Sequence, residues 1–162
     1  MAEIVLFHHA QGLTDGVKSF ADTLRGAGHT VHLPDLYDGH TFDSLDDGLA
    51  FAKQTGFAAI GQRGIDAVNE LPSELVYAGF SLGVMPAQEL AQTRPGAVGA
   101  VFAESCLPIS GEWAIGPWPD GVPVEDETGR RSGGLGPGFR QHFGRDILVT
   151  NEGAASGVWV KG

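Results

Sequence analysis

Cysteine is nearly absent from this chain, which has Cys106 alone among its 162 residues. A single cysteine cannot form a disulfide within the chain, so a reducing, cytoplasmic location is the expectation. Cys106 follows a predicted strand and stands outside any turn motif that would activate it. We therefore interpret it as a buried structural thiol rather than a nucleophile.

Long apolar runs and positive charge are also scarce. No run approaches the roughly 18–20 residues of a membrane span, and the segment 1–7 is too short and too acidic for a signal peptide. The chain has 10 Lys and Arg against 20 Asp and Glu, a net charge of -10. This balance argues against nucleic acids and anionic membranes as partners.

A metal-binding pattern is lacking as well. The acidic loop at 35–47 does not have the D-x-D-x-D-G spacing of a calcium loop. His8 and His9 are adjacent at the end of a predicted strand, where neighbouring side chains point to opposite faces. We therefore expect no metal site in these segments, and we interpret the acidic residues as solvated helix caps.

Strand-like and helix-like segments alternate along the first three quarters of the chain. Short connections between them predict an α/β fold, a mostly parallel sheet with helices on both faces. The predicted strands are 4–7, 30–33, 75–78, 97–102 and one beginning at 121–124, and the predicted helices are 14–25, 44–54, 57–71 and 82–93.

The motif that carries chemistry is G-x-S-x-G at Gly79 to Gly83, with Ser81 at its centre. A strand enters it and a helix leaves it, which is the context of a nucleophile elbow. We expect Gly79 and Gly83 to lack room for side chains and Ser81 to hold a strained backbone at the carboxyl edge of the sheet. The alternative is a tight glycine turn with a capping serine.

An oxyanion hole needs two backbone N–H donors. Leu82, the residue after the proposed nucleophile, is expected to supply the first. The loop after the first strand is expected to supply the second, from Ala10 or Gln11. Each such donor stabilises a transition state by about 3 kcal/mol in hydrolases of this kind.

Several segments in order resemble the dienelactone hydrolase family. They are 5–16 (VLFHHAQGLTDG), 28–39 (GHTVHLPDLYDG), 77–83 (YAGFSLG), 105–108 (SCLP) and 118–124 (WPDGVPV), so the resemblance spans residues 3–124. It implies a three-layer α/β-hydrolase fold and cofactor-free hydrolysis of a small ester or lactone. Members of this family usually carry a cysteine nucleophile and a nearby glutamate. This chain has Ser81 at the elbow and His9 or Ala10 near the position of the glutamate, which favours a serine esterase or lactonase.

The acid and base of a catalytic triad are hard to find. Ser81, Asp126 and His142 follow the chain order of the α/β hydrolases. Only 15 residues separate Asp126 from His142, however, and the glycine-rich segment between them cannot form the usual crossover helix. His8 and His9 end the first strand at the same sheet edge as Ser81, and one of them, His9 in particular, is a candidate substitute base. The simpler interpretation is that His8 and His9 shape the pocket or bond to backbone.

Composition changes near Val124. Residues 1–124 hold all of the net charge of -10, whereas 125–162 are neutral and hold 9 of the 25 glycines. We therefore divide the chain into a hydrolase core (1–124) and a divergent tail (125–162), and we interpret the tail as frameshifted or truncated. Exposed sheet edge would then favour self-association, to a homodimer or larger. A non-catalytic binding module or hydrolase relic is the alternative to an enzyme.

Overall fold

The computed structural model describes residues 1–105, 107, 112 and 114–122, together with the backbone of three strand segments, 124–126, 147–150 and 157–160. The strands of the main sheet are β1 (Glu3–Phe7), β2 (Thr30–His32), β3 (Val76–Phe80), β4 (Gly99–Ala103) and β5 (Val124–Asp126). The helices are α1 (Asp15–Gly26), α2 (Leu45–Thr55), α3 (Phe57–Asp66) and α4 (Val84–Thr93), with a 3-10 turn, η1 (Ser81–Gly83), before α4.

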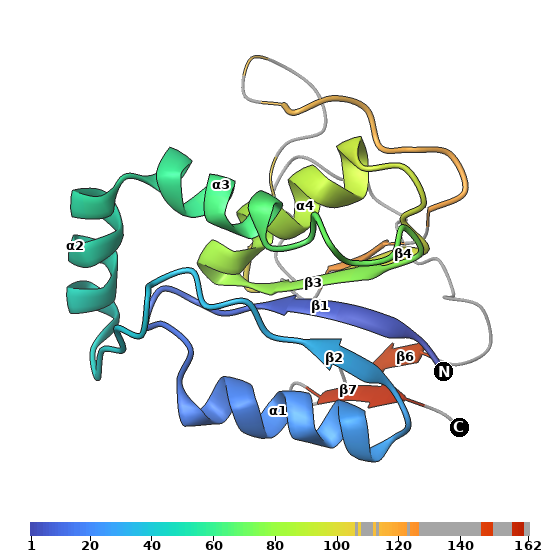
Figure 1. The fold of residues 1–162 in the computed structure, drawn as a ribbon, viewed down its shortest axis with the longest axis horizontal. Coiled ribbons are helices and arrows are strands. Elements are labelled where there is room, and N and C mark those ends of the chain that lie inside the picture. Colours follow the sequence, from blue (N-terminus) through green and yellow to red (C-terminus); the bar gives the residue numbers. More distant parts are fainter. Residues whose placement is uncertain are drawn as a thin grey trace.

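The main sheet has five strands in the order β2-β1-β3-β4-β5, and every neighbouring pair is parallel. Helix α1 lies on one face of this sheet, and α3 and α4 lie on the other (Figure 1). The predicted three-layer α/β architecture with a parallel sheet is confirmed.

Side chains alternate between the two faces along each central strand, as pleated strands require. In β1, Ile4 and Leu6 pack toward α1, where they meet Val17 and Leu24. Both faces of the strand are buried, which explains why its sequence is continuously apolar rather than alternating.

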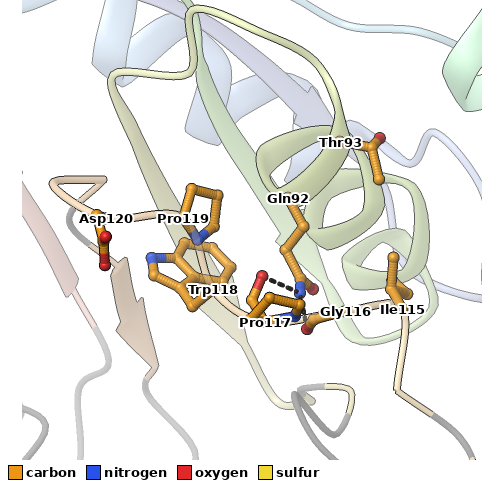
Figure 2. Close-up of a pocket in the computed structure, with 8 residues that line it drawn as sticks. All are labelled: Gln92, Thr93, Ile115, Gly116, Pro117, Trp118, Pro119 and Asp120. Carbon is orange, nitrogen blue, oxygen red and sulfur yellow. Dashed lines mark hydrogen bonds between the residues drawn. The ribbon is translucent and has the colours of Figure 1, made fainter.

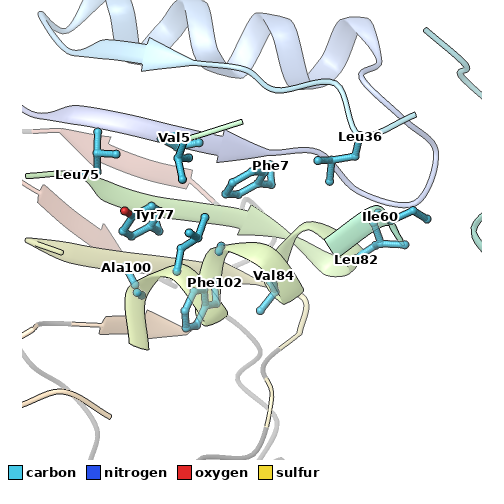
Figure 3. Close-up of a cluster of buried hydrophobic side chains, with 14 of the residues drawn as sticks. Val5, Phe7, Leu36, Ile60, Leu75, Tyr77, Leu82, Val84, Ala100 and Phe102 are labelled. Atoms are coloured by element: carbon cyan, nitrogen blue, oxygen red, sulfur yellow. The ribbon is translucent and has the colours of Figure 1, made fainter. Parts of the chain in front are cut away.

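The larger core cluster fills the face covered by α3 and α4. Val5 and Phe7 of β1 join Tyr77 of β3 and Phe102 of β4 there, all at most 1% exposed. Figure 3 shows these side chains beside Val84, the first residue of α4. The end of β3 is thus held between a buried strand on each side and a buried helix above, so the turn that follows it has a rigid support.

Helix boundaries match the sequence prediction except at α3. Ser44 caps α2, because its hydroxyl accepts a hydrogen bond from the Asp47 N–H at 3.1 Å. Helix α3 ends at Asp66 instead of residue 71. Val68 is nevertheless buried, so the apolar spacing that suggested helix continues through turns that still cover the core.

The C-terminal part of the described chain adds β5 and a separate hairpin. Strands β6 (Ile147–Thr150) and β7 (Gly157–Val160) pair with each other in antiparallel fashion. The apolar segment Ile147–Thr150 thus forms a strand of this second, two-stranded sheet and not of the main sheet. Most of the tail predicted at 125–162, and Cys106, lie outside the described residues, so both interpretations stay predictions. No described helix has the length and apolar character needed to cross a membrane.

Candidate active site at the carboxyl edge of the sheet

Ser81 lies where the strand order reverses direction. The chain leaves β1 to form β2 on one side and then returns to form β3 on the other side of β1. In doubly wound sheets of this order, ligands bind outside the carboxyl ends of the two strands at this switch point. Ser81 directly follows β3, and His9 follows β1 by two residues.

The backbone of Ser81 is held in a left-handed conformation, with φ at 49°. Such a φ is uncommon for a residue with a side chain and costs about 1–3 kcal/mol, so it persists where the surroundings enforce it. Ser81 is partly exposed and begins η1, which leads directly into α4. A serine in this conformation between a strand and a helix has the geometry of a nucleophile elbow.

Gly79 and Gly83 explain how the turn is enforced. A Cβ at Gly83 would lie 2.5 Å from the carbonyl oxygens of Phe7 and His8. A Cβ at Gly79 would collide with the backbone of Gly83 and Val84. Both obstacles are main chain and cannot rotate away. The expectation that neither position has room for a side chain is confirmed.

The expected oxyanion donors differ in their present partners. The Gln11 N–H donates to Nδ1 of His9 at 3.1 Å, so this donor is already engaged. Ala10 is fully buried and lies between His9 and Gln11 in the loop after β1. Of the two alternatives, this geometry favours Ala10 as the partner of Leu82, which is buried beside Ser81.

His9 is not arranged as a base in this conformation. Because Nδ1 accepts from Gln11, the neutral ring carries its hydrogen on Nε2, which lies 3.5 Å from the Thr14 hydroxyl. Burial lowers the pKa of His9, and the negative charge of Glu104 only partly opposes this shift. Accepting the Ser81 proton would require His9 to give up its bond to Gln11, which favours the simpler role of bonding to backbone.

His8 is a structural residue by the same criteria. It is fully buried; its Nδ1–H donates to the His9 carbonyl at 2.8 Å, and its Nε2 accepts from the Leu36 N–H at 2.9 Å. Burial lowers the pKa of His8 and outweighs the opposing effects of the His9 carbonyl and of Asp35. His8 thereby fixes the loop after β2 to the end of β1.

The remaining predicted triad members are not brought to Ser81 by the described structure. The backbone of Asp126 lies in β5 opposite Phe102. Strand β4 therefore separates β5 from β3, and Asp126 is the last residue of β5 rather than part of a loop beyond it. His142 lies outside the described residues.

Glu104 is a residue of this edge that the sequence argument missed. Phe80 pairs with Ala103 in the β3–β4 register, so Ser81 and Glu104 are the first residues after two adjacent parallel strands. Glu104 has φ at 64°, so both residues hold the left-handed conformation. The sequence offered one signal, a carboxylate at a strand end, but the register that aligns it with Ser81 comes only from the fold.

A buried glutamine fixes the loop that follows Glu104. Gln88 of α4 is 1% exposed, and its side-chain amide pairs with both backbone groups of Leu107. Its Nε2 donates to the Leu107 carbonyl at 2.9 Å, and its Oε1 accepts from the Leu107 N–H at 2.7 Å. The helix that begins at the elbow therefore also anchors the chain beyond β4.

A pocket of about 520 Å³ lies elsewhere, against the C-terminal end of α4. Figure 2 shows Gln92 at its centre, donating to the Gly116 carbonyl, with Trp118 and Pro117 alongside. A ten-residue helix rises about 15 Å, so this pocket is separated from Ser81 by the length of α4. We do not assign it to the Ser81 site. Among the described residues, no group of three His, Cys, Asp or Glu side chains could hold a metal.

Known proteins that are similar to this chain are found among solved structures. No protein-family description and no curated protein matches the chain. Among solved structures it is similar to a dienelactone hydrolase-like promiscuous phosphotriesterase from metagenomic libraries, at 26% identity and a TM-score of 0.49 over 63% of this chain and 46% of that one. It is also similar to a Xanthomonas campestris pv. campestris structure described as an α/β-superfamily hydrolase, at 20% identity and a TM-score of 0.48 over 78% and 70% of the two chains. The chain thus spans about half the length of the first of these proteins.

Proposed function

We propose that this protein is a serine hydrolase that cleaves a small ester or lactone with Ser81 as its nucleophile. The observation that carries the proposal is the left-handed Ser81 between two glycines that have no room for side chains. A strained elbow of this kind presents a serine hydroxyl above the sheet at the start of a helix, where developing negative charge is favoured. The Leu82 and Ala10 N–H groups would bind the oxyanion.

Labelling with a fluorophosphonate probe tests the proposal, because the probe reacts with serines that are activated as nucleophiles. We expect the wild-type protein to be labelled and Ser81→Ala to be unlabelled. Ser73→Ala is the matched control: Ser73 is exposed in the loop before β3, at the opposite edge of the sheet. Its loss should leave labelling unchanged.

A folded wild-type protein that resists the probe would overturn the proposal, provided that circular dichroism shows the same helix content in both serine variants. Labelling that survives in Ser81→Ala would place the reactive serine elsewhere and would equally reject this assignment.

The second candidate is a non-catalytic α/β-hydrolase-like binding module or relic. It is favoured by the partners of the two nearby histidines, since His8 and His9 use their ring nitrogens for the Leu36 and Gln11 N–H groups. Such a protein would keep the elbow and lack a base for Ser81. Failure of labelling together with a cooperative unfolding transition is the result expected of it.

We further propose that the protein is located in the cytoplasm and that it associates into a homodimer. The single cysteine supports the first. The open outer strands of the described sheet, β2 and β5, support the second. Neither nucleic acid nor an anionic membrane is proposed as a partner, because the net charge of -10 would repel both.

A further inference from the structure

The loops at the carboxyl edge of the sheet carry negative charge in the described part of the chain. The loops at 8–14, 33–44 and 104–105 contain four carboxylates and no lysine or arginine. These carboxylates belong to Asp35, Asp38, Asp43 and Glu104. Arg63 reaches this edge from α3, but its Nη1 lies 3.0 Å from Oδ2 of Asp38 and compensates that carboxylate.

Of these four carboxylates, Glu104 is the one that follows β4, the strand paired with β3, which leads into Ser81. Both residues come directly after their strands, β3 and β4 are adjacent, and parallel neighbours lie about 4.8 Å apart. Glu104 is exposed, so its side chain faces solvent rather than the core. Its charge also acts on the ring of His9, which follows the strand on the other side of β3. The field of Glu104 therefore extends across the position of Ser81.

We propose that Glu104 sets the charge specificity of the Ser81 site, so that the protein prefers uncharged and cationic esters over anionic ones. This inference rests on the proposed hydrolase function and names its substrate class. An acyl chain bound at Ser81 places a terminal charge within roughly 10 Å of Glu104, where two unit charges at the protein surface change a binding or rate constant about 3- to 10-fold. An anionic ester is disfavoured by this factor and a cationic one is favoured.

Three esters with one leaving group and one chain length test the inference. They are p-nitrophenyl hexanoate, the mono-p-nitrophenyl ester of adipic acid and p-nitrophenyl 6-(trimethylammonio)hexanoate. The wild-type kcat/KM should rank cationic, then neutral, then anionic. Glu104→Gln should lower the neutral-to-anionic ratio about 3- to 10-fold. Glutamine keeps the size of the side chain, so the loop and its backbone conformation are retained.

Glu70→Gln is the matched control, because it removes the same charge from an exposed residue in the loop before β3, at the opposite edge of the sheet. Its neutral-to-anionic ratio should equal that of the wild type. Added salt should lower the ratio in the wild type and should lower it less in Glu104→Gln, since salt screens exposed charges and one of them has been removed.

The outcomes separate the inference from the function on which it rests. Turnover of the esters with equal ratios in wild type and Glu104→Gln overturns the role of Glu104 alone. Absence of turnover of all three esters, with Ser81 unlabelled by a fluorophosphonate, overturns the hydrolase function and the specificity with it. A lowered ratio in Glu104→Gln but not in Glu70→Gln supports the assignment.

Discussion

Gly83 joins the elbow to the end of β1, and its lack of a side chain is the condition for this contact. Gly83→Ala would place a methyl group 2.5 Å from the carbonyl oxygens of Phe7 and His8. Because main-chain atoms must move to relieve this overlap, we expect the free energy of unfolding to fall by about 3 kcal/mol. Urea denaturation measures the change.

Gly61→Ala is the control for Gly83→Ala. Gly61 lies inside α3, and nothing comes within 4 Å of an added Cβ. Alanine should stabilise the helix there by about 0.5–1 kcal/mol. Equal effects of the two substitutions would contradict the tight contact at Gly83.

His8 makes stability depend on pH. Burial lowers its pKa below the ordinary value of 6.5, so protonation favours the unfolded chain. The stability of the fold is therefore complete above about pH 6.5 and decreases as the pH falls toward the depressed pKa of the folded state. His9, whose pKa burial also lowers, contributes in the same direction.

The measurement is the urea midpoint of the wild type and of His8→Gln at several values between about pH 5 and pH 8. Glutamine can both donate and accept but does not titrate in this range. We expect a shallower loss of stability at low pH in His8→Gln. Parallel curves for the two proteins would show that His8 is not the titrating group.

At the residue scale, the turn at Ser81 could be predicted because its signal is local: five consecutive residues between a strand and a helix. The hydrogen bonding of the His9 ring could not be predicted from the sequence in the same way. Its Nδ1 bonds to Gln11 only because the loop after β1 turns back on itself. Glu104 was missed because its relation to Ser81 depends on the β3–β4 register, which no pattern within either segment specifies.

Helix α4 is anchored at its C-terminal end by Arg94, the residue that follows it. The guanidinium donates to the carbonyls of Val68, Leu71 and Pro72 at 2.7–3.1 Å and to the Tyr77 hydroxyl at 3.0 Å. These bonds join α4 to the turns between α3 and β3. Arg94 therefore stabilises β3 and α4, the strand and helix on either side of the elbow, although it lies far from Ser81 itself.

Arg94→Ala should lower the free energy of unfolding by about 2–3 kcal/mol, because it leaves several carbonyls without their charged donor. Arg94→Lys should recover only part of this loss, since an ammonium group cannot reproduce the planar fork. Lys53→Ala removes an exposed positive charge from α2 and should change stability by less than about 0.5 kcal/mol. A small effect of Arg94→Ala would show that water replaces these contacts.

At the scale of elements, the sequence predicted every strand of the main sheet and all four helices. The apolar runs of β1, β3 and β4 are continuous because both of their faces are buried, and this makes them easy to recognise. The end of α3 was wrong because Val68 and Leu71 keep helical spacing while lying in turns. A core position selects for apolar side chains whether or not its backbone is helical.

At the scale of the whole molecule, the outer strands of the main sheet, β2 and β5, each pair with one neighbouring strand in the described part of the chain. Strand β2 has only three residues, and β5 is the last strand on the other side. We expect sedimentation coefficients to rise with protein concentration as copies associate. A single species with the mass of one chain at all concentrations would contradict this prediction.

The architecture of the chain as far as β5 could also be predicted from the sequence. Alternating strands and helices with short connections are compatible with only a few topologies. The strand order β2-β1-β3-β4-β5 is shared by other doubly wound folds, however. The proposed place of ligand binding therefore follows from the switch point between β1 and β3, whereas the proposed chemistry follows from the turn at Ser81.

The paired left-handed residues at 81 and 104 also bear on how this lineage would change over time. Each costs about 1–3 kcal/mol of backbone strain that glycine would not incur. Random mutation under selection for folding alone would therefore favour Ser81→Gly and Glu104→Gly, each of which would make the protein more stable. If related proteins keep a serine and an acidic residue at these two positions, selection must have acted on activity as well as on folding.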